Sequence, residues 1–365
     1  MHIGQRLVFS SLVAAALACS GTSEHPEALP TSSAVTGAKT KERPGFDRYA
    51  HHWTVTTDGD VRAILFPPSG EIVTVGGAYA RVRAREDGKE KRAAQLGCGL
   101  TAGGVTFDPK RGVLLVCTGD IRSLEWPSLT PKTLTQLDDV ALAAAFTDSE
   151  IAIQITTRGT LASKGVFADL VLFDRKTLKR TGNLPSTEGP AALSLEGLPA
   201  GLMVAVFQTG VALREPGSNG WRRFVKGGLP SVAVPSPNGK EVFLSPRPNE
   251  SVTVDVASAT ITRTWRGLSP LSVAWLDLDT IATAGGGKGI RLLDSAKTEV
   301  VSGDDASFDR IAASPKGDVL CAHSTENRKL VCYFDKVPPG YDPKKAKQEN
   351  EKDKEPDPNA VPLLE

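Results

Sequence analysis

Four stretches of the chain repeat one pattern, and this repetition constrains the fold more than any other feature of the sequence. Each stretch has an apolar run, a short turn containing Pro or Gly, and a second run rich in apolar residues. They read ILFPPSGEIVTVGG (64–77), TFDPKRGVLLVCTG (106–119), VPSPNGKEVFLSP (234–246) and AASPKGDVLCAHS (312–324). Two short apolar runs on either side of such a turn are typical of a β-hairpin. The pattern therefore predicts strand pairs that recur along the chain.

The turns recur at a regular spacing. Aligned on the turn between the first two strands, the repeats give seven equivalent positions: Gly70, Gly112, Ser149, Gly201, Gly239, Asp279 and Gly317. The six steps from residue 70 to residue 317 average about 41 residues, within the range of roughly 40 to 45 for the four-stranded blades of a β-propeller. No helical stripe interrupts the series, and Gly, Pro, Asn and Asp bound the short strands. We therefore expect an all-β, seven-bladed β-propeller of four-stranded antiparallel blades over residues 51–337.

The predicted third strands give a family resemblance. DLVLFD (169–174), RLLD (291–294) and LVCYFD (330–335) end in Asp after Phe or Leu. These endings resemble the Trp-Asp end of the third strand in WD40 repeats, although no repeat has both the Gly-His and the Trp-Asp pair of that family. The chain is therefore similar to a degenerate member of the WD40 or YVTN-type propellers.

The two ends of the repeat region are each incomplete. The last repeat offers three strands, at 308–313, 318–322 and 328–334, and the segment HWTVTT (52–57) precedes the first repeat without a partner there. An unpaired strand edge is a liability for aggregation. We expect residues 52–57 to supply the outer strand of the last blade and so to close the ring.

Four cysteines follow Cys19 in the chain. Cys321 and Cys332 lie at mirror positions about the turn STEN (324–327), so they face each other across a predicted hairpin. Cys98 precedes the first strand of the second repeat and Cys117 ends its second strand, which makes them the second candidate pair. An even number of cysteines suits an oxidising compartment. The alternative is four buried free thiols.

The N-terminal segment has the layout of a secretory signal peptide over residues 1–18. Arg6 precedes an apolar stretch from Leu7 to Leu17, and Ala18 is followed by Cys19. The junction ALACSG resembles a bacterial lipobox, although Ala16 stands where that motif prefers Leu. The resemblance implies that Cys19 is lipidated and that the protein is exported and anchored to the outer membrane. The alternative is an ordinary signal peptide that is cleaved nearby.

The segments on either side of the repeats have the composition of solvated chain. Residues 19–50 comprise the lipid anchor and a stretch rich in Ser, Thr, Ala, Pro and Gly, typical of a flexible tether. Residues 338–365 contain KKAKQENEKDKEPDPN, whose mixed charge and prolines leave little apolar surface to bury. We expect this tail to be disordered.

Residue patterns for catalysis, cofactors or metals are weak. TAGGGKGI (283–290) lacks the Ser or Thr of a phosphate-binding loop. His51, His52 and His323 offer no zinc or copper cluster, and TTDGD (56–60) lacks the downstream Glu of a calcium loop and is interpreted as a turn at a strand end. The GxSxG motif is absent. We predict no catalytic, cofactor or metal residues.

A candidate binding face follows from the propeller expectation. The connections from an outer strand to the next inner strand, and from a second to a third strand, meet on one rim. The longest of them, TTRGTLASKGVF (156–167), belongs to the third repeat, and inserted loops often carry function. A tolerated insertion without a role is the alternative. The residues predicted on this rim are Arg158, Lys164, Phe167, Asp138, Asp139, Glu188, Arg266, Asp304 and Asp305.

The functional expectation is a non-enzymatic binding or scaffold module of the cell envelope, with envelope proteins as partners. Net charge is +1 and no basic stripe with interleaved aromatics is present, so we expect no nucleic-acid partner, and membrane contact only through the lipid anchor. The ring is expected to be monomeric. One alternative is a YVTN-like propeller hydrolase or lactonase, with acidic side chains around the central channel. The other is an outer-membrane assembly factor, but the propeller of that machinery has eight blades.

Overall fold

The computed structural model describes residues 49, 51–156, 169–184, 194–198, 200–207, 210–218, 220–226, 232–285, 289–294, 298–301 and 306–337. The predicted signal peptide, Cys19, the tether apart from Tyr49, and the charged tail lie outside these residues. Within the described ranges every element is a strand except for a short 3-10 turn at Tyr49. No helix in these ranges has the length and apolar character to cross a bilayer.

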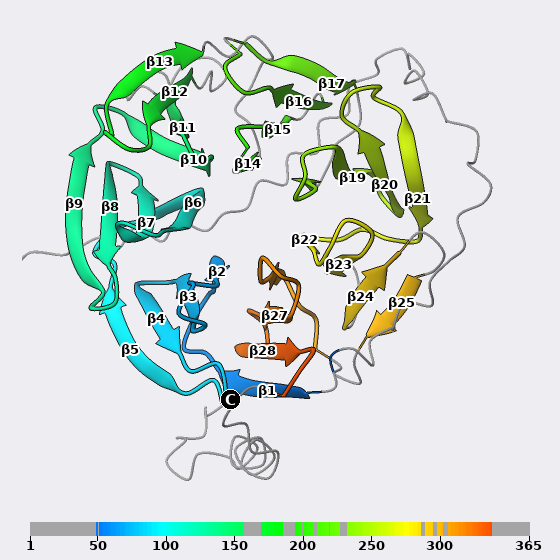
Figure 1. Cartoon of the computed structure of the whole chain (residues 1–365), viewed down its shortest axis with the longest axis horizontal. Coiled ribbons are helices and arrows are strands. Elements are labelled where there is room, and N and C mark those ends of the chain that lie inside the picture. The colour runs from blue at the N-terminus through cyan, green and yellow to red at the C-terminus, as the bar shows by residue number, and fades with distance from the viewer. Residues whose placement is uncertain are drawn as a thin grey trace, which may run out of the picture.

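The strands succeed one another around a common centre in chain order (Figure 1). The described residues form five four-stranded sheets and one sheet of eight strands. The eight-stranded sheet consists of two antiparallel groups of four, which join where Ala143 of β10 pairs in parallel with Ala102 of β6. We therefore refer to seven four-stranded units, numbered in chain order.

The strands of the first three units have the following bounds. Unit one contains β2 (Ala63–Leu65), β3 (Ile72–Gly76), β4 (Tyr79–Arg83) and β5 (Glu90–Gln95). Unit two contains β6 (Leu100–Asp108), β7 (Gly112–Cys117), β8 (Asp120–Glu125) and β9 (Thr130–Gln136). Unit three contains β10 (Val140–Phe146), β11 (Glu150–Thr156), β12 (Asp169–Asp174) and β13 (Arg180–Leu184).

The remaining units follow the same order. Unit four contains β14 (Ser194–Gly197), β15 (Met203–Phe207), β16 (Gly210–Arg214) and β17 (Arg222–Lys226). Unit five contains β18 (Ala233–Pro235), β19 (Glu241–Arg247), β20 (Glu250–Asp255) and β21 (Ile261–Arg266). Unit six contains β22 (Ser272–Trp275), β23 (Ile281–Ala284), β24 (Ile290–Leu293) and β25 (Thr298–Val301). Unit seven contains β26 (Arg310–Ala313), β27 (Val319–Ser324), β28 (Lys329–Phe334) and, at its outer edge, β1 (His51–Thr56).

The middle strands have continuous apolar sequences because both of their faces are buried. In β7, Val113 and Leu115 pack against unit one, whereas Leu114 and Val116 pack against unit three. Alternate side chains of a strand point to opposite faces, so one strand contributes to two cores. The outer strands β5 and β21 alternate instead between exposed and more buried positions, as expected where one face meets water.

The cores lie between consecutive units. In the described residues, seven clusters of buried apolar side chains each draw on two neighbouring units. One of these clusters joins the last unit to the first, since Trp53, Cys321 and Phe334 pack there with Ile64 and Ile72. The same packing principle therefore applies at the junction between the two ends of the repeat region.

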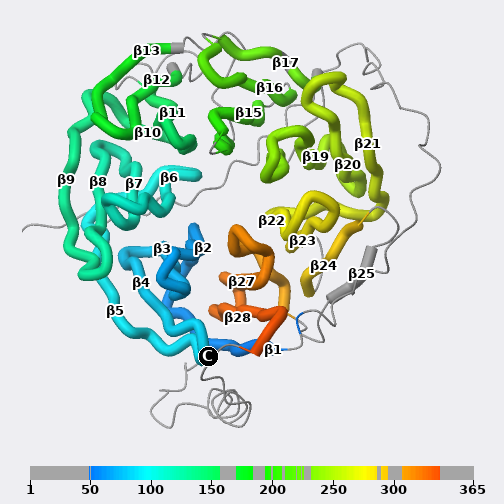
Figure 2. The backbone as a smooth tube through the Cα atoms, viewed as in Figure 1, coloured from blue at the N-terminus to red at the C-terminus, as the bar shows by residue number. Residues whose placement is uncertain are grey.

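The strand β1 pairs with β28, as predicted for residues 52–57. The pairing is antiparallel and extends from His51, opposite Phe334, to Thr56, opposite Lys329. Figure 2 shows the two strands side by side, one from each end of the coloured chain. Tyr49, just before β1, is buried in the core between units six and seven and donates a hydrogen bond of 2.6 Å to the Gly317 carbonyl. A packed residue thus lies two positions before the predicted start at residue 51.

The seven aligned turn positions all lie at the turn between the first and second strands of a unit. Gly112 shows why glycine is needed at one of them. Its φ is 83°, and a Cβ there would lie 2.2 Å from the Leu124 carbonyl oxygen. The inner strand of unit one, β2, covers only Ala63–Leu65, and Pro67 and Pro68 have no amide hydrogen to extend the ladder beyond its C-terminal end.

Candidate functional site

Three of the predicted rim residues lie within the described part of the chain. Asp138 and Asp139 occupy the connection from β9 to β10, and Arg266 ends β21. Asp138 and Arg266 are exposed, and Asp139 is half-buried. All three belong to the predicted rim, but units three and four separate Arg266 from the acidic pair in chain order. The other six, Arg158, Lys164, Phe167, Glu188, Asp304 and Asp305, lie outside the described residues.

Two exposed apolar side chains on the same rim were not predicted. Tyr79 begins β4 after the turn from β3 and is 41% exposed, and Leu271 precedes β22 and is 63% exposed. The backbone of Leu271 is fixed, because its N–H donates a hydrogen bond of 2.9 Å to the Ala284 carbonyl. The sequence did offer a signal for Tyr79 and Leu271, because each is an apolar residue placed directly between a turn and a strand.

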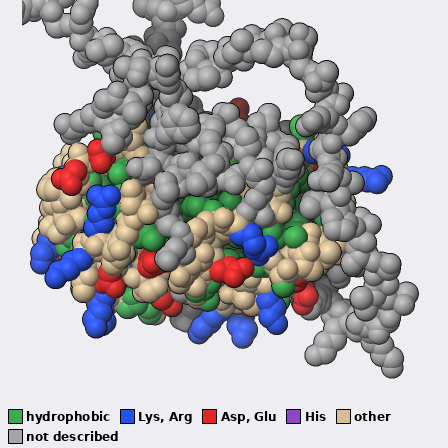
Figure 3. All heavy atoms as spheres, turned by 90° about the horizontal axis from the view of Figure 1, so that it is seen from above, with side chains coloured by type: hydrophobic (Ala, Val, Ile, Leu, Met, Phe, Trp, Pro, Cys, Tyr) green, Lys and Arg blue, Asp and Glu red, His purple; other side chains and the backbone are tan. Residues whose placement is uncertain are grey.

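The charges on the described surface are mixed. In the side view of Figure 3, Lys and Arg side chains are interspersed with Asp and Glu side chains along the visible edge. Many of them form exposed ion pairs, such as Arg62 with Asp60 and Lys132 with Glu125. This surface agrees with the balanced charge of the sequence.

Both predicted disulfides are present. Cys98 is bonded to Cys117, and Cys321 is bonded to Cys332. The second pair consists of directly opposed residues of β27 and β28, as the mirror positions about the turn predicted. Both Cys321 and Cys332 are fully buried.

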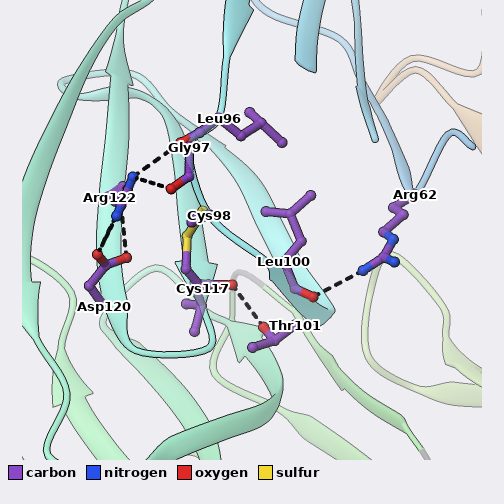
Figure 4. Close-up of a disulfide and its surroundings, with 10 residues drawn as sticks. Arg62, Leu96, Gly97, Cys98, Leu100, Thr101, Cys117, Asp120 and Arg122 are labelled. Atoms are coloured by element: carbon purple, nitrogen blue, oxygen red, sulfur yellow. Dashed lines mark hydrogen bonds and ion pairs between the residues drawn. A yellow bond between two sulfur atoms is a disulfide. The ribbon is translucent and has the colours of Figure 1, made fainter. Parts of the chain in front are cut away.

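The Cys98–Cys117 disulfide has charged neighbours, shown in Figure 4. A carboxylate oxygen of Asp120 and the two sulfur atoms lie within 4.8 Å of one another, a spacing compatible with metal ligation. The sulfur atoms are already joined, however, and Asp120 forms an ion pair of 2.7 Å with Arg122. Arg122 in turn donates hydrogen bonds to the carbonyls of Leu96 and Gly97, so the group ties β8 to the segment that carries Cys98.

His323 belongs to a buried chain of polar groups rather than to an open site. Its Nε2 lies 2.9 Å from the Thr57 hydroxyl, and its Nδ1 lies 3.6 Å from an Asp309 carboxylate oxygen. The imidazole is fully buried, and this burial lowers the pKa of His323, although Asp309 and Asp60 oppose the shift. Thr57 follows β1, so the histidine links unit seven to the connection that leads into unit one.

The segment TTDGD (56–60) connects β1 to β2, as the turn interpretation predicted. Asp58 forms an ion pair with Arg81, and Asp60 forms one of 3.1 Å with Arg62. Its carboxylates are therefore engaged by arginines of unit one.

The inner strands carry few ionisable side chains. They are Glu196 on β14, Arg310, which begins β26, and Asp108, which ends β6. Water reaches the Glu196 side chain, yet protein surrounds it closely, and this burial raises the pKa of Glu196 to about 7 against the opposing influence of Arg310. The acid and the base belong to units four and seven, so their interaction extends across the centre of the fold.

The comparisons with known proteins identify the fold. No protein-family model matches the chain, and no curated protein matches it. Among solved structures, the WD40 domain of Pan2 from Neurospora crassa is similar, with a TM-score of 0.59 at 10% identity, over 76% of this chain and 89% of that chain. At this identity the likeness concerns the fold alone. The chain has a WD40-like β-propeller fold, as the third-strand endings and the repeat spacing predicted.

Proposed function

We propose that the protein is a lipid-anchored β-propeller that serves as a non-enzymatic protein-binding or scaffold module in the bacterial cell envelope. The observation that carries this proposal is the WD40-like fold, in which packed sheets hold loops at a rim without depending on them. Rigid scaffolds with variable surface loops are well suited to recognition. The exposed side chains of Tyr79 and Leu271 on that rim give a partner apolar surface to bury.

The proposal includes a ring of seven blades closed by β1. The seven four-stranded units and the seven cores between neighbouring units support the blade count. The six residue pairs between β1 and β28 support closure at the last blade. A closed ring favours a monomer, because each unit then leaves only one short outer edge strand.

The inner strands favour binding over the hydrolase alternative. A hydrolase of the YVTN-like type predicts several carboxylates and a histidine at the mouth of the channel. The described inner strands instead present Glu196 opposite Arg310, and His323 is enclosed between Thr57 and Asp309. Neither arrangement offers a substrate a cluster of accessible acids.

Photo-crosslinking in intact cells tests the proposal. A photoreactive amino acid is placed at Asp138, at Arg266 and in the loop at Phe167, with control positions at Lys110 and Lys316, which are exposed in turns of the opposite rim. We expect the first three positions to capture the same envelope protein and the controls to capture none of it. Equal capture from both rims, or no specific product, would contradict the proposed face.

The anchoring part of the proposal has its own test. Replacement of Cys19 by Ala removes the sulfur that lipidation requires. We expect the variant to leave the membrane fraction while the rim positions keep their crosslinking partner. A Cys19→Ala protein that remains in the membrane fraction would exclude a lipid anchor at this residue.

A further inference from the structure

A cavity of about 210 Å³ lies beside the connection between β1 and β2, which is one of the outer-to-inner connections of the proposed rim. It is bounded by that connection (57–61), by Thr74 and Gly76 of β3, and by the stretch from Gly77 through Tyr79, Arg81 and Arg83 of β4. Because unit seven ends at β1 and unit one begins at β2, we call this cavity the seam pocket.

The strand register places the side chains that line the seam pocket on one face of unit one. Thr74 pairs with Arg81, and Gly76 pairs with Tyr79. Alternate residues of β4 share a face, so Tyr79, Arg81 and Arg83 point to the same side. Gly76 allows the connection to cross here, because a Cβ at this position would lie 2.0 Å from the Asp60 carbonyl oxygen.

Arg83 is a buried cation with unused hydrogen-bonding capacity. The residue is 6% exposed; its Nη1 donates a hydrogen bond of 3.3 Å to the Gly88 carbonyl, and its Nε has no partner. Burial lowers the pKa of Arg83, with Glu90 and Asp58 acting in the opposite direction. A guanidinium has five N–H donors in a planar fork, and a carboxylate matches two of them at once. The wall formed by Arg83 therefore suits a carboxylate group.

The other charged groups of the seam pocket lie nearer to solvent. The side chains of Asp58 and Asp60 are 68% and 44% exposed, and each is paired with an arginine, Arg81 and Arg62 respectively. Arg81 is also held by Glu90 at 2.7 Å and lies over the Tyr79 ring. The pocket thus has Arg83 at its buried side, the paired Arg81 beside it, and two acids at its exposed side. This order disfavours a second negative charge on a ligand and favours a positive one.

We propose that the seam pocket binds a small zwitterion of the α-amino-acid type, with its carboxylate at Arg83 and its ammonium group toward Asp58 and Asp60. The volume of about 210 Å³ supports a ligand of this size, because it lies below the roughly 300 to 1,000 Å³ of pockets that hold drug-sized ligands. The site lies on the proposed rim and shares Tyr79 with it, and it extends the proposed function from protein binding to a small ligand.

Isothermal titration calorimetry of the full-length protein tests this inference. The probes are glycine and L-alanine, with acetate as the carboxylate alone, L-alanine methyl ester as the ammonium alone, and inorganic phosphate as a competing anion. We expect glycine and L-alanine to bind one per chain, and acetate and the ester to bind about tenfold more weakly or less. Tighter binding of phosphate than of glycine, or no binding of either amino acid in the millimolar range, would overturn the proposal.

Variants assign the binding to the seam pocket. Arg83→Gln should weaken L-alanine binding by about tenfold or more, and Arg83→Lys should weaken it too, because the ammonium lacks the planar fork. Arg85→Gln is the matched control, since Arg85 pairs with Asp318 and does not line the pocket.

Should Arg83→Gln fail to fold, the double variant Asp58→Asn and Asp60→Asn remains informative, because both side chains are exposed. It should weaken L-alanine and strengthen acetate; a parallel change in both, or unchanged binding in a folded Arg83 variant, would overturn the assignment.

Discussion

The indole Nε1 of Trp53 donates a hydrogen bond of 2.9 Å to the main-chain carbonyl oxygen of Arg85. Trp53 lies on β1, in the ladder of unit seven, whereas Arg85 follows β4 of unit one. The indole ring of Trp53 also lies against Gly88, where a Cβ would be 2.6 Å from the Trp53 Cε3. A strand that completes the last unit is therefore fastened to the first by its largest side chain.

Substitution of Trp53 tests this fastening. Trp53 is 1% exposed, so Trp53→Ala should lower the free energy of unfolding by about 3 to 5 kcal/mol through the cavity that it leaves. Trp53→Phe keeps most of the packing but leaves the Arg85 carbonyl without its donor, a loss of about 1 to 2 kcal/mol. Urea unfolding measures the loss in both variants. The matched control is Trp221→Phe, because Trp221 of unit four is half-buried. Equal losses for Trp53→Phe and Trp221→Phe would contradict the role of the indole N–H.

Removal of β1 tests closure at the level of the whole fold. A chain that lacks residues 1–57 loses the six residue pairs with β28, and it leaves that strand as an open edge. We expect a lower melting temperature and a tendency to aggregate, measured by differential scanning calorimetry and light scattering. The control lacks residues 1–48 and keeps both Tyr49 and β1. An unchanged melting temperature after removal of residues 1–57 would refute closure by this strand.

The repeat is visible in the sequence because each middle strand packs against two cores and therefore has an unbroken run of apolar residues. Leu114 and Leu115 are neighbours in sequence but belong to different clusters, and such runs recur in every unit. The partners of Cys321 and of β1 were equally predictable, because a hairpin fixes the register of its strands and an incomplete last unit requires an outer strand.

The features that were missed depend on contacts between distant segments. The stretch YARVR (79–83) has the alternation of a strand with one exposed face, yet Arg83 is buried. The connection that follows β1 (57–61) borders the same pocket as Arg83, and it lies there because β1 pairs with β28 at the other end of the repeat region. No local pattern in β4 signals that event, so the seam pocket could not be predicted from composition or spacing.

The two disulfides should differ in their accessibility to reductant. Cys321 and Cys332 are both fully buried, whereas Cys98 is half-buried. Because a thiolate must reach the sulfur that it attacks, mild reductant under native conditions should open Cys98–Cys117 first. Alkylation followed by mass spectrometry measures the order. Opening of Cys321–Cys332 before Cys98–Cys117 would contradict the prediction.

Loss of either disulfide should also lower stability. The bonds close loops with sequence separations of 19 and 11 residues. Loop-closure entropy gives about 3 kcal/mol for each in the chain-entropy account. The Cys98→Ala and Cys117→Ala pair, and the Cys321→Ala and Cys332→Ala pair, should each show a loss of this size in urea unfolding. A loss well below 1 kcal/mol would mean that unfolded-state constraint contributes little.

Protonation of His323 should destabilise the fold in mild acid. Burial lowers the pKa of His323 in the folded protein, so the unfolded chain binds the proton at higher pH than the folded one does. The stability is thus fully present above the unfolded pKa of about 6.5 and is lost as the pH falls below it, by at most about 1.4 kcal/mol per pH unit for one proton. Urea unfolding across this range should show a weaker pH dependence for His323→Gln than for the unsubstituted protein. An identical slope in both would contradict the prediction.

Glu196 should act with the opposite sign. Burial raises the pKa of Glu196 to about 7, so between its ordinary pKa near 4.5 and this value the folded protein holds a proton that the unfolded chain has released. Stability therefore falls as the pH rises through this window, because a charged carboxylate must then be kept at the centre of the fold. Glu196→Gln removes the charge, and it should stabilise the protein more at about pH 8 than at about pH 5. The control is Glu125→Gln, whose side chain is 52% exposed on β8 and should change stability little at either pH. Equal effects of Glu196→Gln at both pH values would contradict the prediction.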